Sequence, residues 1–273
     1  MIETIRCVTP DGAINGARVT RPSGEPKAGA LVFVHGVGST AAIWDTQLET
    51  FGKDRLCTAI ELRGNGALKP DPDPALITRS GYAQDVLTIA DALAIERFTL
   101  IGCSLGGVVG FELWLRTPER IESFVLLGSF ARYPNGDEYA RKIASDVRDA
   151  GSMRIFAERR AAKLGLAPAR LRETIEQMAC KSVECYLAST QATWTGDYLD
   201  VLPTINVPVL VAYGERDAIA PGALSEEIAT RVTGARLAMI PGAGHVANAD
   251  EPERFNEMLR SFVASNHGNV GKD

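Results

Sequence analysis

Short apolar runs alternate along this chain with stretches whose apolar residues have helical spacing. The clearest runs are 31–34, 98–101 and 124–127. A strand that is apolar on both faces belongs in a sheet covered by helices on both sides, which is typical of parallel sheets. Strands that alternate with helices therefore predict an α/β fold with a mostly parallel central sheet flanked by helices.

The same pattern extends over most of the chain. Further strands are expected at 2–8, 13–20, 56–62, 207–213 and 236–240, and helices at 41–51, 80–94, 108–115, 224–231 and 251–264. Asp11-Gly12, between the first two strands, is a hairpin signal because glycine tolerates the positive φ of tight turns.

The alternation stops between residues 131 and 195, where the pattern is helical and shows no convincing strand. We predict a core formed by 1–130 and 196–267, a helical cap at 131–195, and a flexible tail at 268–273. Ligands bind at the carboxyl ends of the strands in such folds. Motifs that directly follow strands are therefore the candidates for chemistry.

Composition excludes several classes of function. The 273 residues carry a formal net charge of −5, which argues against nucleic-acid binding. No apolar run approaches the ~18 residues that a membrane span needs, and residues 1–8 do not form a signal peptide. Five scattered cysteines without a C-x-x-C pair indicate free thiols. We expect a cytoplasmic protein that binds a small molecule, without nucleic-acid or membrane partners.

The strongest motif is Gly102-x-Ser104-x-Gly106, between an apolar strand and an apolar helix. A serine on such a turn is held in a strained conformation, and small neighbours are needed because the backbone folds sharply around it. The following helix directs its N-terminus at any developing oxyanion. The alternative is a glycine-rich structural turn, but the strand–turn–helix context favours a serine nucleophile.

A serine hydroxyl needs a base to act as a nucleophile at neutral pH. The chain has three histidines. His267 lies near the polar C-terminus, and His35, directly after a strand, is expected to be structural. His245 follows the last predicted strand on a loop beside the strand ends. We therefore predict His245 as the general base, with a surface-loop histidine as the alternative.

An imidazole base needs an acceptor that fixes its tautomer. Asp217 follows the strand predicted at 207–213, and it gives the chain order Ser, Asp, His that is expected for a serine on a strand-to-helix turn. Glu215 and Asp250 are rival acceptors. We predict Asp217 for this role.

Two backbone N–H groups are expected to form an oxyanion hole. One belongs to Leu105, directly after the nucleophile, and the other to Val37 in the loop after the strand at 31–34. Gly36 and Gly38 allow that loop to approach a substrate closely, although they are also compatible with a simple tight turn.

Other chemistries fit less well. His35-Gly-Val-Gly38 is not a full dinucleotide-binding fingerprint, and no lysine follows 102–107 as in a phosphate loop. Cys103 is expected to pack against the fold, with a thiol role as the alternative. Neither a metal nor a cofactor is expected.

Over about residues 5–263 the chain resembles the α/β-hydrolase family. Within that family, Gly102-Cys-Ser-Leu-Gly-Gly107 and the segment from His245 through Pro252 to Phe255 resemble the 3-oxoadipate enol-lactonase branch and its carboxylesterase neighbours. The resemblance implies an α/β-hydrolase fold with a four-helix cap. It also implies hydrolysis of esters and lactones without a cofactor.

The resemblance carries the catalytic triad over to Ser104, Asp217 and His245. It carries the oxyanion donors over to Val37 and Leu105.

One segment departs from the family pattern. Glu61 and Asn65 stand where the family motif D-x-R-G-H-G-x-S has Asp and His. That motif is usually structural, so the departure leaves the triad intact.

We therefore expect a serine hydrolase that cleaves a small ester or lactone through an acyl-enzyme. Two alternatives use the same fold, namely a C–C bond hydrolase of vinylogous diketones and an acyltransferase or perhydrolase. A ligand sensor without turnover, or an interaction protein with a relic site, are the non-enzymatic alternatives.

The predicted cap carries a small excess of positive charge, with 11 Lys/Arg against 8 Asp/Glu over 131–194. This charge would favour an anionic substrate, but a solvated helix surface is the simpler interpretation. Arg159 and Arg160 are expected to be exposed. Trp44 and Trp194 are candidates for lining the substrate pocket, with core packing as the alternative.

Overall fold

The computed structural model describes residues 1–26, 28–66, 68–162 and 168–267, so the tail predicted at 268–273 lies outside the described residues. Its centre is an eight-stranded sheet in the order β1-β2-β4-β3-β5-β6-β7-β8. The strands are β1 Glu3–Val8, β2 Ile14–Thr20, β3 Ala30–Val34, β4 Cys57–Glu61, β5 Phe98–Cys103, β6 Ile121–Leu127, β7 Val209–Gly214 and β8 Arg236–Ile240.

The sheet is parallel from β4 to β8, and only β2 runs antiparallel to both of its neighbours. The hairpin between β1 and β2 turns at Gly12, whose φ of 84° lies in the region that glycine adopts without strain. The predicted fold class, a mostly parallel sheet flanked by helices, is confirmed.

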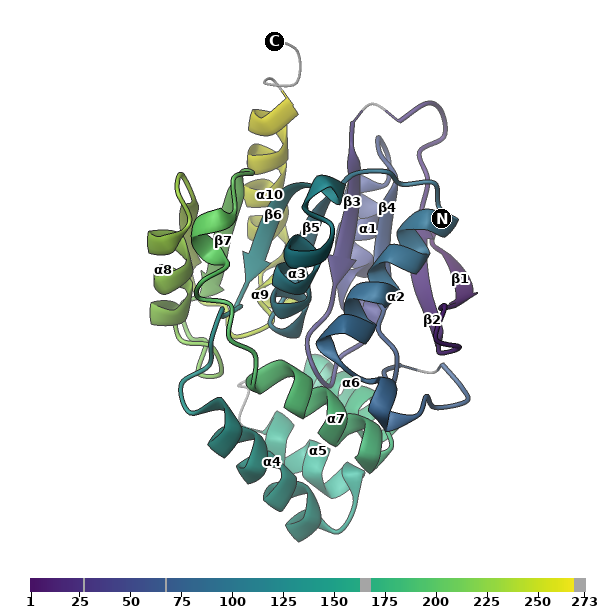
Figure 1. Ribbon diagram of the computed structural model, residues 1–273, viewed down its shortest axis with the longest axis vertical. Coiled ribbons are helices and arrows are strands. Elements are labelled where there is room, and N and C mark those ends of the chain that lie inside the picture. Colours follow the sequence, from purple (N-terminus) through teal and green to yellow (C-terminus); the bar gives the residue numbers. More distant parts are fainter. Residues whose placement is uncertain (27, 67, 163–167, 268–273) are drawn as a thin grey trace.

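Helices cover both faces of the sheet (Figure 1). Residues of α2, α3 and α8 join one buried cluster, and residues of α1, α9 and α10 join another. The core helices are α1 Asp45–Phe51, α2 Arg79–Ala92, α3 Leu105–Arg116, α8 Gly222–Arg231, α9 Ala247–Asp250 and α10 Pro252–His267. Short 3₁₀ helices lie at Ala41–Trp44, Pro74–Leu76, Pro118–Arg120 and Leu202–Thr204.

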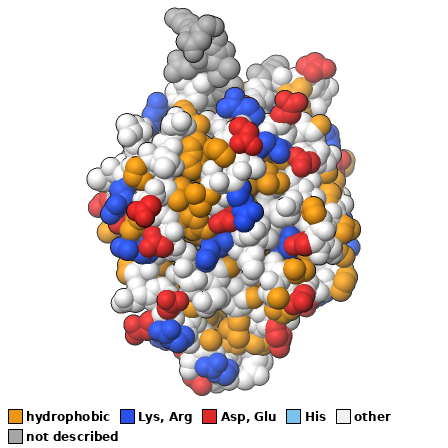
Figure 2. Space-filling view, viewed as in Figure 1, with side chains coloured by type: hydrophobic (Ala, Val, Ile, Leu, Met, Phe, Trp, Pro, Cys, Tyr) orange, Lys and Arg blue, Asp and Glu red, His pale blue; other side chains and the backbone are white. Residues whose placement is uncertain are grey.

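Charged side chains of both signs are interspersed over the face of the molecule in Figure 2, rather than separated by sign. A surface of this kind has no large single-sign field on that face. Among the described residues, no helix is both long enough and apolar enough to cross a membrane.

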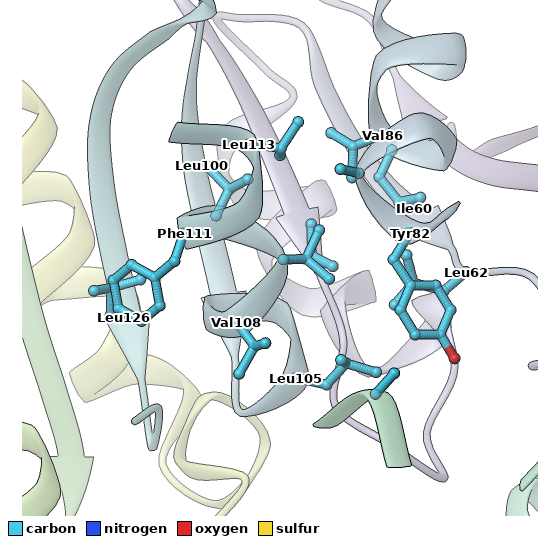
Figure 3. Close-up of a cluster of buried hydrophobic side chains, with 14 of the residues drawn as sticks. Ile60, Leu62, Tyr82, Val86, Leu100, Leu105, Val108, Phe111, Leu113 and Leu126 are labelled. Atoms are coloured by element: carbon cyan, nitrogen blue, oxygen red, sulfur yellow. The ribbon is translucent and has the colours of Figure 1, made fainter. Parts of the chain in front are cut away.

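The larger core lies between the sheet and helices α2 and α3 (Figure 3). Leu100 of β5 and Leu126 of β6 lie beneath Val108 and Phe111 of α3, and all four are buried. Burying an aliphatic or phenyl side chain of this size stabilises a fold by about 1.5–3 kcal/mol. Helix α3 comes close to the sheet at Gly110, where a Cβ would lie 3.0 Å from a methyl group of Leu100.

The helical stretch between β6 and β7 forms four helices, α4 Gly136–Ala150, α5 Met153–Ala161, α6 Pro168–Ala179 and α7 Val183–Trp194. We call α4–α7 the helical layer. It lies at the end of the sheet where β3 and β5 finish (Figure 1). The chain enters and leaves this layer at adjacent points, because Tyr198 N donates to the Ala131 carbonyl at 2.9 Å and Arg132 forms a bridge with Asp197.

A buried ion pair fixes the loop after β4. The Arg63 side chain is fully buried, and its Nε donates to Asp85 Oδ1 at 2.9 Å. Arg63 Nη1 reaches Asp11 in the β1–β2 turn at 2.6 Å, and the Arg63 amide donates to Asp85 Oδ2 at 2.8 Å. One side chain thus joins the hairpin, the β4 loop and helix α2.

Replacing Arg63 with Met is expected to destabilise the protein by about 3–5 kcal/mol, because the buried Asp85 carboxylate loses its partner. Urea unfolding of the variant and the wild type measures this difference. Arg154→Met is the matched control, because it breaks an exposed pair with Glu176 and should leave the unfolding midpoint unchanged. Equal midpoints for Arg63→Met and the wild type would contradict a structural role for the buried pair.

Candidate active site

Ser104 lies at the turn between β5 and α3, with φ of 53° and ψ of −112°. A positive φ is strained for a residue with a Cβ, and it persists only where the surroundings hold it. The Ser104 amide donates to the Leu127 carbonyl of β6 at 2.9 Å, and the Ser104 carbonyl accepts from the Gly107 amide at 2.9 Å. The turn is therefore fixed from both sides.

The two glycines that flank Ser104 have no room for a side chain. A Cβ on Gly102 would collide with the Gly106 backbone, and a Cβ on Gly106 would collide with the Val34 carbonyl of β3. This close packing is the physical reason for the Gly-x-Ser-x-Gly spacing.

The Ser104 hydroxyl is buried, and it has no hydrogen-bond partner among the described residues. It lines a small cavity together with His245. A buried hydroxyl without a partner is costly in a folded protein, so its position calls for a functional explanation.

His245 and Asp217 form a hydrogen-bonded pair. His245 Nδ1 lies 2.8 Å from Asp217 Oδ2, and the Asp217 side chain is fully buried while that of His245 is 15% exposed. The other carboxylate oxygen of Asp217 accepts from the amides of Ile219 at 2.8 Å and Ala220 at 2.9 Å. Because an ionised carboxylate only accepts hydrogen bonds, His245 Nδ1 carries the proton that it donates to Asp217. His245 Nε2 is then left as the basic nitrogen.

Gly128, directly after β6, lies against this pair. A Cβ at Gly128 would be 3.0 Å from Asp217 Oδ2 and 3.2 Å from His245 Nδ1, and the φ of Gly128 is 51°. Space and backbone conformation both require glycine there. No motif in the sequence marks Gly128 as part of the site.

The two rival acids hold the histidine loop instead of the histidine ring. Glu215 Oε2 accepts from the Gly242 amide at 2.8 Å, and Asp250 Oδ2 accepts from the Gly244 amide at 2.9 Å. Both carboxylates satisfy backbone donors just before His245.

The loop after β3 lies beside the serine. A Cβ on Gly36 would be 3.3 Å from the Ser104 Cβ, which shows how closely this backbone approaches. Among the described residues, no backbone hydrogen bond occupies the amide of Val37, and Leu105 is the first residue of α3, so its amide has no acceptor within the helix. Two N–H groups are thus available beside the serine.

His35 is fully buried and holds the same loop. Its Nδ1–H donates to the Gly36 carbonyl at 2.8 Å, and its Nε2 accepts from the Leu62 amide at 3.3 Å. With both ring nitrogens bonded to backbone, His35 has the structural environment that the sequence predicts for it. The side chain of His267 lies outside the described residues.

The two residues that depart from the family motif are held near this loop. Glu61 Oε2 accepts from the Ala41 amide at 3.1 Å, just after the loop, and Asn65 Oδ1 accepts from Lys181 Nζ at 3.0 Å. Lys181 also donates to the Ser39 carbonyl of the loop at 3.1 Å.

Lys181 lies between α6 and α7 and is 6% exposed, so it ties the helical layer to the loop after β3. Burial lowers the pKa of Lys181 to about 8, and the nearby Glu61 carboxylate partly opposes that shift. Nothing in the sequence pattern around Lys181 marks it as buried.

The cavity at Ser104 has a volume of about 70 Å³, and residues of α5, α6 and α7 line it. Trp194 lines it, whereas Trp44 does not. Trp44 is fully buried on the other face of the sheet, with its ring 5.2 Å from Phe33 and 5.9 Å from Phe255. The structure therefore places Trp44 in the core, which is the alternative to pocket lining that the sequence left open for it.

Two arginines that were not singled out for the site line the cavity, Arg160 of α5 and Arg170 of α6. Arg159 is exposed as expected, but Arg160 is partly buried. The sequence suggests exposure because charged residues of surface helices normally face water, and only the packing of α5 against α6 and α7 encloses Arg160.

Neither a thiol nor a metal cluster marks this site. Burial raises the pKa of the Cys103 thiol, which keeps it protonated, and its sulfur points to the His245 carbonyl at 3.9 Å. No group of three or more His, Cys, Asp or Glu side chains that could hold a metal ion occurs in the described part of the chain.

Comparison with known proteins identifies one family for this chain. A model described as "Alpha/beta hydrolase family" matches residues 31–258. A putative carbamate hydrolase, RutD, of Rhizobium rhizogenes is 28% identical over 87% of this chain and 94% of its own length. The 3-oxoadipate enol-lactonase 2 of Acinetobacter baylyi is 25% identical over 88% and 90%. The carboxylesterase YbfK of Bacillus subtilis is 25% identical over 88% and 82%.

Among solved structures, a hydrolase from Pseudomonas aeruginosa superimposes with a TM-score of 0.85 at 28% identity, covering 95% of this chain and 98% of that one. The resemblance to the α/β-hydrolase family, with enol-lactonase and carboxylesterase relatives, is thereby confirmed.

The buried Lys181 makes stability depend on pH. Its pKa in the folded protein lies below the unfolded value of 10.5, so the cost of burying its charge is full below about pH 8 and disappears toward pH 10.5. The free energy of unfolding of the wild type, relative to that of Lys181→Met, should therefore rise by up to about 3 kcal/mol between pH 7 and pH 10.

Urea unfolding at pH 7, 8.5 and 10 measures this difference. Lys142→Met is the matched control, because Lys142 is exposed on α4 and its difference from the wild type should not change over this range. Parallel pH curves for wild type and Lys181→Met would refute the lowered pKa.

Proposed function

The chain belongs to the alpha/beta hydrolase family, and we propose that it is a serine hydrolase that cleaves small carboxylic esters or lactones through an acyl-enzyme. One observation carries this proposal. The strained Ser104 and the histidine of the His245–Asp217 pair line the same cavity, and the serine hydroxyl has no competing partner among the described residues.

In the proposed reaction, Ser104 Oγ attacks the carbonyl carbon and its proton passes to His245 Nε2. Asp217 accepts from His245 Nδ1–H, which fixes the tautomer and stabilises the imidazolium. The amides of Val37 and Leu105 donate to the oxyanion of the tetrahedral intermediate.

Collapse of that intermediate breaks the C–O bond, and His245 gives its proton to the departing alcohol. The acyl group remains on Ser104. Water then attacks the acyl carbon while His245 accepts its proton, and a second collapse releases the carboxylic acid and restores the serine. Atoms and charge balance without a cofactor.

The relatives support hydrolysis of an acyl–oxygen bond. Their names describe an enol-lactonase and a carboxylesterase, both of which act on esters, and a putative carbamate hydrolase. A carbamate offers the same planar carbonyl to Ser104 and is a second substrate class for this site.

The size of the cavity favours small substrates. About 70 Å³ is well below the 300 Å³ of a typical site for a drug-sized ligand. We propose that the helical layer acts as a cap whose helices set the limit on acyl length.

The alternatives differ in product. A C–C bond hydrolase would release two carbonyl-containing fragments from a vinylogous diketone, and an acyltransferase or perhydrolase would pass the acyl group to another alcohol or to peroxide. A sensor would bind an ester or a lactone and return no product. Product analysis of the same reaction mixtures therefore separates all of them.

Hydrolysis of p-nitrophenyl butyrate should fall by roughly 10⁴–10⁶-fold in Ser104→Ala, because the nucleophile is lost. Ser225→Ala is the matched control. Ser225 is a buried serine on α8 whose hydroxyl also has no partner among the described residues, and its loss should leave the rate unchanged. A Ser104→Ala variant with full activity would contradict the serine mechanism.

Asp217→Asn should lower kcat by roughly 10⁴-fold, because an amide cannot hold the same histidine tautomer. Asp250→Asn and Glu215→Gln each keep an oxygen that accepts from the same backbone amide and lose only the charge, so each should cost about tenfold or less. Stopped assays at saturating substrate compare the three. An Asp250→Asn variant as inactive as Asp217→Asn would reassign the acid.

A further inference from the structure

Arg160 of α5 lines the cavity that contains Ser104 and His245. Its guanidinium keeps its charge at any pH at which the protein folds. Asp146 and Asp149 line a second pocket with Arg160, but across the ranges that the structure describes Arg160 forms no ion pair with a carboxylate. A partly buried guanidinium without a counter-ion is unusual, because charges of this kind are normally paired.

Three tyrosines lie near enough to interact electrostatically with the Arg160 guanidinium, Tyr133, Tyr139 and Tyr186. Burial raises the pKa of Tyr133 to about 12 and also raises that of Tyr186, so both hydroxyls stay neutral. Neutral hydroxyls do not cancel the positive charge of Arg160.

Two of these tyrosines also contact residues that line the cavity. The rings of Tyr133 and Tyr139 lie 4.6 and 4.8 Å from that of Trp194, which lines the cavity. The Tyr133 hydroxyl donates to the Ile219 carbonyl at 3.0 Å, and Ile219 lines the same cavity. Arg160 thus sits beside the cavity wall that faces Ser104.

The rest of the cavity wall is suited to an anion. None of the described residues that line it is acidic. Arg170 contributes a second guanidinium, whose Nη1 is paired with Glu173 at 2.6 Å while its buried Nε has no partner. The Trp194 indole N–H is also buried without a partner. The residues that line this cavity therefore include an arginine without an ion pair, Arg160, and two with unpartnered N–H donors, Arg170 and Trp194.

We propose that Arg160 is a specificity-determining residue that binds a carboxylate carried by the substrate, away from the bond that Ser104 attacks. This inference rests on the serine hydrolase function proposed above and adds the substrate class, a small ester, lactone or carbamate that bears a carboxylate. Arginine suits this role because its planar fork pairs with both oxygens of a carboxylate. A neutral substrate would leave the charge and the free donors unsatisfied, which gives the site discrimination.

The outer surface is a poor source of the same selectivity. On the face in Figure 2 the charges are mixed, and exposed charges are screened by salt within about a Debye length. Arg160 is partly buried where it lines the cavity, and a partly buried charge pair is screened much less.

The test compares matched pairs of substrates that differ only in charge. The first arm places the carboxylate on the acyl side, with monomethyl esters of malonate to adipate against the corresponding methyl ester amides. The second arm places it on the alcohol side, with acetoxyacetate against acetoxyacetamide. The readout is the ratio of kcat/KM for the acid to that for the amide, with product acids measured by NMR.

The wild type should favour the carboxylate member by roughly 10–100-fold in one arm, and that arm identifies the side of the substrate that Arg160 binds. Arg160→Met should remove the preference, and Arg160→Lys should keep part of it, because the charge remains but the fork is lost. Arg159→Met is the matched control, since its exposed neighbouring guanidinium does not line the cavity, and it should keep the full preference.

Two results would overturn the inference. One is equal rates for acid and amide in both arms, and the other is a preference that survives in Arg160→Met. If p-nitrophenyl butyrate is cleaved in a Ser104-dependent way while acid and amide react equally, the serine hydrolase function stands and only the anion site fails.

If no ester is turned over, calorimetry with glutarate and the Ser104→Ala variant decides the matter. Binding that is lost on adding Arg160→Met supports the anion site without the hydrolase function. Absence of binding, or binding that is unchanged by Arg160→Met, overturns it.

Discussion

The backbone around Ser104 leaves no space for a side chain at either flanking glycine. Gly102 and Gly106 pack against each other and against β3, while the serine amide is hydrogen-bonded to β6. Three adjacent strands therefore hold one residue at a positive φ, and the sheet carries the cost of that strain. The position of every other group in the site follows from this contact, because the loops after β3, β6, β7 and β8 converge on the same strand ends.

Charge is distributed unevenly between the two sides of the cavity. On the sheet side, the Asp217 carboxylate accepts hydrogen bonds from two amides and from His245, and Asp217 does not itself line the cavity. On the helical side, Arg160 lines the cavity and forms no ion pair with a carboxylate among the described residues. In the proposed function the sheet side transfers the proton and the helical side binds the substrate, and Lys181 connects the two sides through the Ser39 carbonyl.

Local patterns in the sequence predict the sheet and the positions of Ser104, Asp217 and His245, because each follows directly from a strand and its turn. They fail where distant residues satisfy a local conflict. The strand expected at 124–127 begins earlier, at Ile121, since the Ser123 hydroxyl is paired with Thr99 of β5 at 2.8 Å and a polar residue is tolerated inside the sheet. Arg160 is expected to face water, and its partial burial arises only from the packing of α5 against α6 and α7, which no local sequence pattern shows.

The helical layer departs from the sheet and returns to it at nearly one point, where Tyr198 meets Ala131 and Arg132 meets Asp197. A segment anchored in this way can change in length and sequence without displacing β6 or β7, as surface insertions with adjacent ends do. A change in the helical layer can therefore alter the cavity that it lines while the strand ends that position Ser104 and His245 stay in place.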